Sequence, residues 1–162
     1  MDIRNRILIN RGEVAVSSRA VLETNISTCV SVCLYHPEFR LGGMTHISRS
    51  REVDTTPSGK NLRTSGYYYA DNAIPRVLHL FGQRYPAIRD KSLEMVVAGG
   101  LNNEGPVSET LAKLHEYEFK VVGLDVNKLV YRRVVFDTAL GIVTVGRKEP
   151  FSKIKVEKRF KF

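Results

Sequence analysis

Short runs of alternating apolar and polar residues, separated by two stretches with helical spacing, make up most of this 162-residue chain. Val30, Val32 and Leu34 alternate with smaller side chains, and β-branched residues at a period of two indicate a strand. Residues 30–35 and 41–47 are expected to pair as a hairpin. The full set of predicted strands is 3–9, 13–17, 30–35, 41–47, 93–98, 119–126, 131–136 and 142–145.

Two amphipathic helices are expected between these strands. An apolar stripe that includes Ile74 and Phe81 predicts a helix with its N-cap at Asp71 or Asn72. The second helix is expected to begin near Pro106, because proline is favoured in a first turn. Strands followed by helices between further strands predict an α/β fold, with mixed or antiparallel β-sheets packed with two main helices.

The composition fits one domain with its own core, at 43% hydrophobic and 26% charged residues. No apolar run approaches the about 18–20 residues of a membrane helix, and no signal peptide is recognisable at the N-terminus. Two cysteines are too few for a disulfide scaffold. We therefore expect a cytoplasmic protein without membrane insertion, and without a cofactor because no glycine-rich phosphate loop is present.

Positive charge gathers at the C-terminal end of the chain. Residues 147–162 hold seven Lys or Arg and two Asp or Glu, which is +5 of the net charge of +8. This predicts a domain over 1–147 followed by a basic C-terminal tail, 148–162. Such a tail either attracts an acidic partner or only keeps the protein soluble. Nucleic acid is not expected, because no binding motif or aromatic platform accompanies the charge.

Cys29 and His46 are the candidate chemical pair. If residues 36–39 form a four-residue hairpin loop, Tyr35 faces Arg40, and the same register places Cys29 opposite His46. Opposed residues hold their Cβ atoms about 4.5–5.5 Å apart on one face, and a thiol beside an imidazole is typical of an activated cysteine nucleophile. A one-residue slip would move His46 to the other face. In the alternative interpretation, Cys29 is a small buried apolar residue.

Cys33 is not expected to bond to Cys29 or to share a metal with it. Four residues of strand span about 13 Å, whereas the Cα atoms of a disulfide lie about 4.4–6.8 Å apart. The same separation argues against a zinc site built from the two cysteines with His36 and His46. We therefore expect no metal centre.

Two segments resemble the CheD family of bacterial chemotaxis proteins: Thr-Cys-Val-Ser-Val-Cys-Leu-Tyr at 28–35 and Gly-Gly-Met-Thr-His-Ile at 42–47. The resemblance implies a protein-glutamine deamidase (a glutaminase) with Cys29 as nucleophile and His46 as base. It also implies a fold similar to the deamidase domain of the cytotoxic necrotizing factors. Its implied partners are the cytoplasmic helical domain of methyl-accepting chemoreceptors and a CheC-type phosphatase. Further matching segments are 69–75, 98–100 and 125–141.

The chain departs from the family pattern just before the cysteine. The family usually has a catalytic threonine six residues earlier, where this chain has Glu23 followed by Thr24. Thr24 is therefore a candidate catalytic residue, although Glu23 and Thr28 are also close enough in sequence to support the pair. Ser27 and Thr28 replace a Gly-Ser pair and are candidate substrate contacts.

These changes leave a second function open, that of a regulator with little or no catalysis that binds chemoreceptors or a CheC-type phosphatase. The polar segment 48–66 follows the strand that carries the histidine. It is expected to be a long loop at the border of the site, since loops of this length are often functional.

Overall fold

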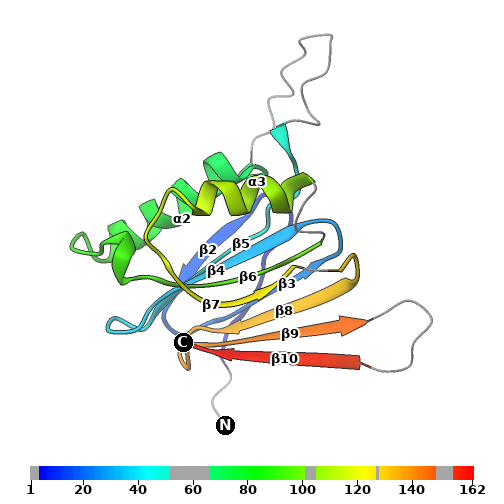
Figure 1. The fold of residues 1–162 in the computed structure, drawn as a ribbon. Coiled ribbons are helices and arrows are strands. Elements are labelled where there is room, and N and C mark those ends of the chain that lie inside the picture. The colour runs from blue at the N-terminus through cyan, green and yellow to red at the C-terminus, as the bar shows by residue number, and fades with distance from the viewer. Residues whose placement is uncertain (1–3, 52–65, 101–104, 127, 149–154) are drawn as a thin grey trace.

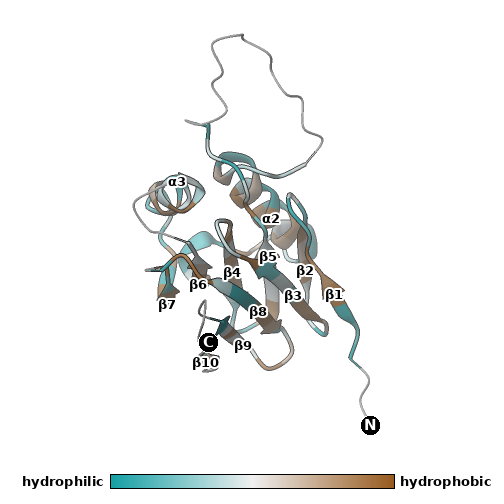
Figure 2. Ribbon diagram, turned by 90° about the vertical axis from the view of Figure 1, so that its right-hand side faces the viewer, coloured by the Kyte–Doolittle hydropathy of each residue, from teal (hydrophilic) through white to brown (hydrophobic). Residues whose placement is uncertain are grey.

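The computed structural model describes residues 4–51, 66–100, 105–126, 128–148 and 155–162, and these form three stacked layers (Figure 1). Helices α2 (Ala70–Arg84) and α3 (Gly105–Leu114) cover one face of a middle sheet, and an outer sheet lies against its other face (Figure 2). The predicted α/β class, with mixed sheets and two main helices, is confirmed. None of the helices described here is long and apolar enough to cross a membrane.

Each sheet has five strands. The middle sheet runs in the order β2 (Val14–Ser17), β5 (Leu41–Thr45), β4 (Val30–His36), β6 (Glu94–Gly99) and β7 (Lys120–Asp125), and a short 3₁₀ helix (Asp90–Ser92) precedes β6. The outer sheet runs in the order β1 (Arg6–Leu8), β3 (Val21–Ile26), β8 (Tyr131–Asp137), β9 (Ile142–Lys148) and β10 (Lys155–Lys161).

Strand β4 separates the two cores, and all seven of its residues are buried. Val30, Val32 and Leu34 belong to the core under the helices. Cys29 and Cys33 belong to the core between the two sheets. This alternation is the period of two seen in the sequence, with both faces covered.

The register of the β4–β5 hairpin differs from the predicted one. His36 pairs with Leu41 and Cys33 pairs with Met44, and the same register continues to the bridge between Val30 and Ile47. The prediction that Tyr35 faces Arg40 and Cys29 faces His46 is therefore wrong by two positions. Because a shift by two preserves the face, His46 still lies on the inter-sheet face with Cys29.

The turn explains this difference, because it spans residues 37–40 and leaves His36 as the last paired residue. Arg40 adopts a left-handed backbone conformation with φ of 49°. The Nδ1 atom of His36 accepts a hydrogen bond from the Phe39 N–H at 3.3 Å, and the two rings stack with centroids 4.6 Å apart. A side chain that was expected in the loop thus closes the hairpin.

Other elements also differ from the expected ones. Helix α2 begins earlier than predicted, with Tyr69 as its N-cap and the Asn72 Oδ1 accepting from the Tyr69 N–H at 3.2 Å. Strand β3 was not among the predicted strands. Strand β10 lies within the segment set apart above as a basic tail, 148–162, and pairs with β9 along its whole length. Most of the predicted loop, from 52 to 65, is outside the described residues.

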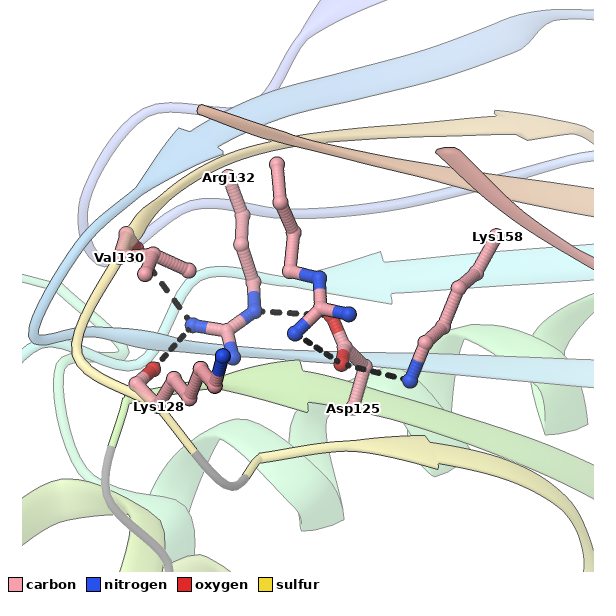
Figure 3. A network of polar contacts seen from close by, with 6 residues as sticks. Asp125, Lys128, Val130, Arg132 and Lys158 are labelled. Carbon is pink, nitrogen blue, oxygen red and sulfur yellow. Dashed lines mark hydrogen bonds and ion pairs between the residues drawn. The ribbon is translucent and has the colours of Figure 1, made fainter. Parts of the chain in front are cut away.

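A group of charges centred on a buried carboxylate joins the two sheets at one edge (Figure 3). Asp125, at the end of β7, accepts hydrogen bonds from Arg132 Nε at 2.9 Å and Lys158 Nζ at 3.3 Å, and its carboxylate lies 3.6 Å from Arg147 Nη1. We call these four residues the Asp125 cluster. Arg132 pairs in register with Ile26, the last residue of β3. The cluster therefore anchors the strand that leads into the loop before Cys29.

Candidate active site

His46 follows β5 directly, and its ring contacts β3 of the outer sheet. The Thr24 hydroxyl lies 2.8 Å from Nδ1 of His46 and donates a hydrogen bond to the carbonyl of Ile9 at 2.7 Å. The same carbonyl lies 3.2 Å from Nδ1 of His46. All three residues are buried. Thr24 faces inward because it lies on the same face of β3 as Leu22 and Ile26, which both belong to the inter-sheet core.

The proton positions at this site can be assigned from the available donors. A carbonyl oxygen only accepts, so the single hydroxyl proton of Thr24 is used on Ile9. Thr24 Oγ1 then accepts from His46, which places the imidazole proton on Nδ1 and leaves Nε2 as a free acceptor. Nε2 is buried and has no hydrogen-bond partner among the described residues. The imidazole is therefore held as a base with its lone pair unused.

Cys29 lies at the end of the β3–β4 loop, with 5% of its surface exposed. In the observed register it is a diagonal neighbour of His46 on the same face, which typically places Cα atoms about 7–8 Å apart. Its carbonyl accepts from the Gly100 N–H at 3.3 Å. A Cβ at Gly100 would lie 3.2 Å from the carbonyl oxygen of Ser27, so a glycine allows this close approach to the cysteine loop.

Burial disfavours the charged forms of both Cys29 and His46. Burial raises the pKa of the Cys29 thiol, and the positive charge of Arg11 and a hydrogen bond from Thr28 offset only part of this rise. Burial also lowers the pKa of His46, an effect that the Ile9 carbonyl opposes and Arg11 strengthens. The raised thiol pKa and the lowered imidazole pKa both favour the neutral forms at rest over a thiolate–imidazolium pair.

The remaining predicted site residues lie in two different places. Glu23 points away from the inter-sheet core, and its carboxylate binds Arg6 and Arg133. Those ion pairs lower the pKa of Glu23, with the hydrogen bond from Arg133 as the largest cause. Ser27 and Thr28 are exposed next to Cys29. Of the three candidates for a supporting group, Thr24 is the one in direct contact with His46.

A pocket of about 390 Å³ opens onto the histidine. Two features of its wall were not identified from the sequence: Arg11, whose charge acts on both Cys29 and His46, and the carbonyl of Ile9. The N–H of Gly12 donates a hydrogen bond to the His46 carbonyl at 2.9 Å. A backbone carbonyl leaves no signal in a sequence. The residues that line the pocket are Leu8, Ile9, Asn10, Arg11, Thr24, Asn25 and His46.

Cys33 differs from Cys29 in its surroundings. It is 1% exposed, and burial raises the pKa of its thiol to about 12. A thiol with that pKa stays protonated at neutral pH and is unreactive. Across the described part of the chain, no three His, Cys, Asp or Glu side chains gather closely enough to hold a metal ion.

Fold and site together define an α/β protein that carries a cysteine, a histidine and a threonine between two β-sheets. No family model matches the chain. It is similar to curated proteins named probable chemoreceptor glutamine deamidase CheD. The one from Methanococcus vannielii is 30% identical over 127 residues, covering 74% of this chain and 77% of the relative. The chain therefore belongs to the CheD family.

Two further relatives carry similar names and match longer segments. A CheD 1 from Shewanella oneidensis is 28% identical over 159 residues, covering 89% of this chain and 73% of the relative. A CheD from Pseudomonas savastanoi pv. phaseolicola is 26% identical over 167 residues, covering 96% of this chain and 91% of the relative.

Proposed function

We propose that this chain is a protein-glutamine deamidase that acts on chemoreceptors, with Cys29 as nucleophile, His46 as base and Thr24 as the group that orients His46. The observation that carries the proposal is the contact of Thr24 with His46, because it fixes the imidazole tautomer with Nε2 free. The names of the relatives supply the substrate class: they are described as acting on chemoreceptor glutamines.

The neutral resting pair implies that proton transfer accompanies attack. Nε2 of His46 takes the Cys29 proton as the sulfur attacks the carbonyl carbon of the glutamine side chain. The imidazolium then gives this proton to the departing amide nitrogen, which leaves as ammonia, and a thioester remains on Cys29. In the second half, Nε2 removes a proton from water, hydroxide attacks the thioester, and glutamate leaves as the thiol is restored.

The charge that develops on the carbonyl oxygen needs backbone N–H donors near the nucleophile. The N–H groups of Val30 and Gly100 already donate to Ile47 and to Cys29. The remaining candidates on this loop are the N–H groups of Thr28 and Cys29. Because Ser27 and Thr28 are exposed beside the thiol, we also assign them to contact the polypeptide that carries the glutamine.

The proposed partner is the cytoplasmic helical domain of a methyl-accepting chemoreceptor, which places the protein in the cytoplasm. A net charge of +8 favours encounter with an acidic partner. A CheC-type phosphatase is a second proposed partner, implied by the family resemblance alone.

One observation favours the second candidate function, that of a binding regulator with weak catalysis. Cys29 is buried and its pKa is raised, so little thiolate is present without substrate. An efficient enzyme would need receptor binding to expose the thiol. A regulator that binds the receptor through the same face would not need this exposure.

The deciding experiment measures ammonia release from a purified receptor cytoplasmic domain. The variants are Cys29→Ala and His46→Ala, and Cys33→Ala serves as matched control because it removes a buried thiol from the same sheet face. We expect release by wild type and by Cys33→Ala, and none by the other two, with glutamine-to-glutamate conversion located by mass spectrometry. Receptor binding by wild type without any release would instead support the regulator.

A further inference from the structure

Ser31 lies directly across from His46 in the hairpin. The pairs on either side, Cys33 with Met44 and Val30 with Ile47, fix this register. Ser31 follows Cys29 by two positions in the strand, so its side chain is on the same inter-sheet face. Opposed residues on one face hold their Cβ atoms about 4.5–5.5 Å apart. The serine hydroxyl is therefore a near neighbour of the imidazole.

The side-chain atoms of this pair are both buried and both without a hydrogen bond. Ser31 is 0% exposed and His46 is 4% exposed. Neither Oγ of Ser31 nor Nε2 of His46 has a partner among the described residues, so the two atoms are not bonded to each other in this structure. The nearest alternative for the hydroxyl is the Cys33 thiol, whose pKa rise it slightly opposes, but a thiol is a weak partner.

An unpaired buried polar atom is costly, and native structures hold few of them. These two atoms lie on facing residues, and one of them belongs to the proposed base, so a turn of the serine side chain could bring them together. Nε2 carries no hydrogen at rest, so it has nothing to donate. Once it has taken the proton from Cys29, it becomes a donor that needs an acceptor. A serine hydroxyl turns between staggered positions at little cost and has free lone pairs.

We infer that Ser31 is a positioning residue for catalysis, whose hydroxyl accepts the Nε2–H of protonated His46 while the substrate is being attacked. The inference rests on the proposed function, because it assigns Nε2 as the atom that receives the proton. Nδ1 contacts Thr24 and the Ile9 carbonyl, and Ser31 would accept a hydrogen bond from Nε2. The ring thus keeps one orientation in both of its protonation states.

Other charges act on His46 from neighbouring segments, and they stay constant when Ser31 is changed. Arg11 disfavours the protonated ring and Glu13 favours it, both from the loop between β1 and β2. Cys29 and Cys33 are titratable groups on the same face, and burial raises the pKa of both thiols, so both are neutral at rest. A change in proton binding on removal of the Ser31 hydroxyl therefore reports the hydroxyl itself.

The test is a titration of the imidazole ¹⁵N signals of His46, one of four histidines in the chain, together with deamidation kinetics. In Ser31→Ala, we expect His46 to bind its proton about tenfold more weakly and deamidation to fall about tenfold, the value of one hydrogen bond to a charged group. Ser31→Thr keeps the hydroxyl and should restore both. Thr110→Val is the matched control, because Thr110 is another buried residue whose hydroxyl has no partner within the described parts of the chain, and it lies on α3 at the other core.

The outcomes separate this inference from the proposed function. Unchanged proton binding and unchanged kinetics in Ser31→Ala would falsify the role of Ser31, and the proposed deamidase would stand. Weaker proton binding in Ser31→Ala, combined with no deamidation by wild type, would keep the contact and refute the enzyme. If Ser31→Thr is too bulky to fold, as its melting curve would show, the titration of Ser31→Ala still decides.

Discussion

Replacing Asp125 with Asn tests whether the Asp125 cluster holds the two sheets together. The carboxylate is 2% exposed and faces three cations, of which Arg132 is fully buried and Arg147 is 13% exposed. Asn keeps the size of the side chain but removes its charge. The buried guanidinium of Arg132 would then lack its counterion, and breaking a buried pair in this way costs about 3–5 kcal/mol.

The assay is urea unfolding followed by circular dichroism, with a thermal scan beside it. A loss of this size lowers the Tm by roughly 10 °C for a chain of this length. The matched control is Asp71→Asn, which breaks a pair with Arg51 in which both side chains are about half exposed. That control should change the free energy of unfolding by less than about 1 kcal/mol. Equal stability of Asp125→Asn and wild type would refute the reasoning.

The cluster also predicts how the difference between Asp125→Asn and wild type depends on pH. Burial alone would raise the pKa of Asp125, but the hydrogen bond and charge of Arg132, with Lys158 and Arg147, more than offset it and hold the pKa below its ordinary value. A lowered pKa in the folded state contributes stability above the unfolded pKa of about 3.9 and loses it as the pH falls. The difference in unfolding free energy between wild type and Asp125→Asn should therefore be constant near neutral pH and become smaller below about pH 4.

Three further predictions concern the site and the sandwich. Thr24→Val should slow ammonia release about tenfold, because the base loses its hydrogen-bonded support, while receptor binding is unchanged. Gly123→Ala should lower the free energy of unfolding by about 1–3 kcal/mol, since its Cβ would clash with the ring of Phe160. Gly82→Ala, where the added Cβ meets open space, should be neutral or slightly stabilising. Mass mapping after iodoacetamide should find Cys29 alkylated with receptor bound, and Cys33 unmodified until the protein unfolds.

The fold class and the hairpin could be predicted because apolar periodicity reports burial. The period of two in β4 survives in the structure as an alternation between two cores. Strand β3 escaped prediction because its outward positions carry Glu23 and Asn25 and hide the inward pattern. Strand β10 was missed for the same reason, because most of its residues are charged. Lys158 and Phe160 both point inward from it.

The shared sheet face of Cys29 and His46 could be predicted from spacing, but the register of the hairpin could not. The register depends on the His36 side chain, which closes the turn by accepting from a backbone N–H. The tautomer of His46 depends on the carbonyl of Ile9, a group that every residue has and no sequence marks. Thr24 stood in the sequence as one of three options, and its contact with His46 is what separates it from Glu23, whose carboxylate binds two arginines.

The outer sheet has a consequence for how the chain reaches its folded state. Its neighbours β3 and β8 come from opposite ends of the sequence, and the hydrogen bond from Thr138 to Ala20 spans 118 positions. Forming contacts between residues so far apart in sequence first costs the entropy of closing a long loop, which makes folding slow. On a ribosome, β3 is synthesised early but must wait for β8. Thr24 can therefore meet Ile9 and His46 early, since both lie close to it in the sequence, but its strand gains β8 as a neighbour only when the chain is nearly complete.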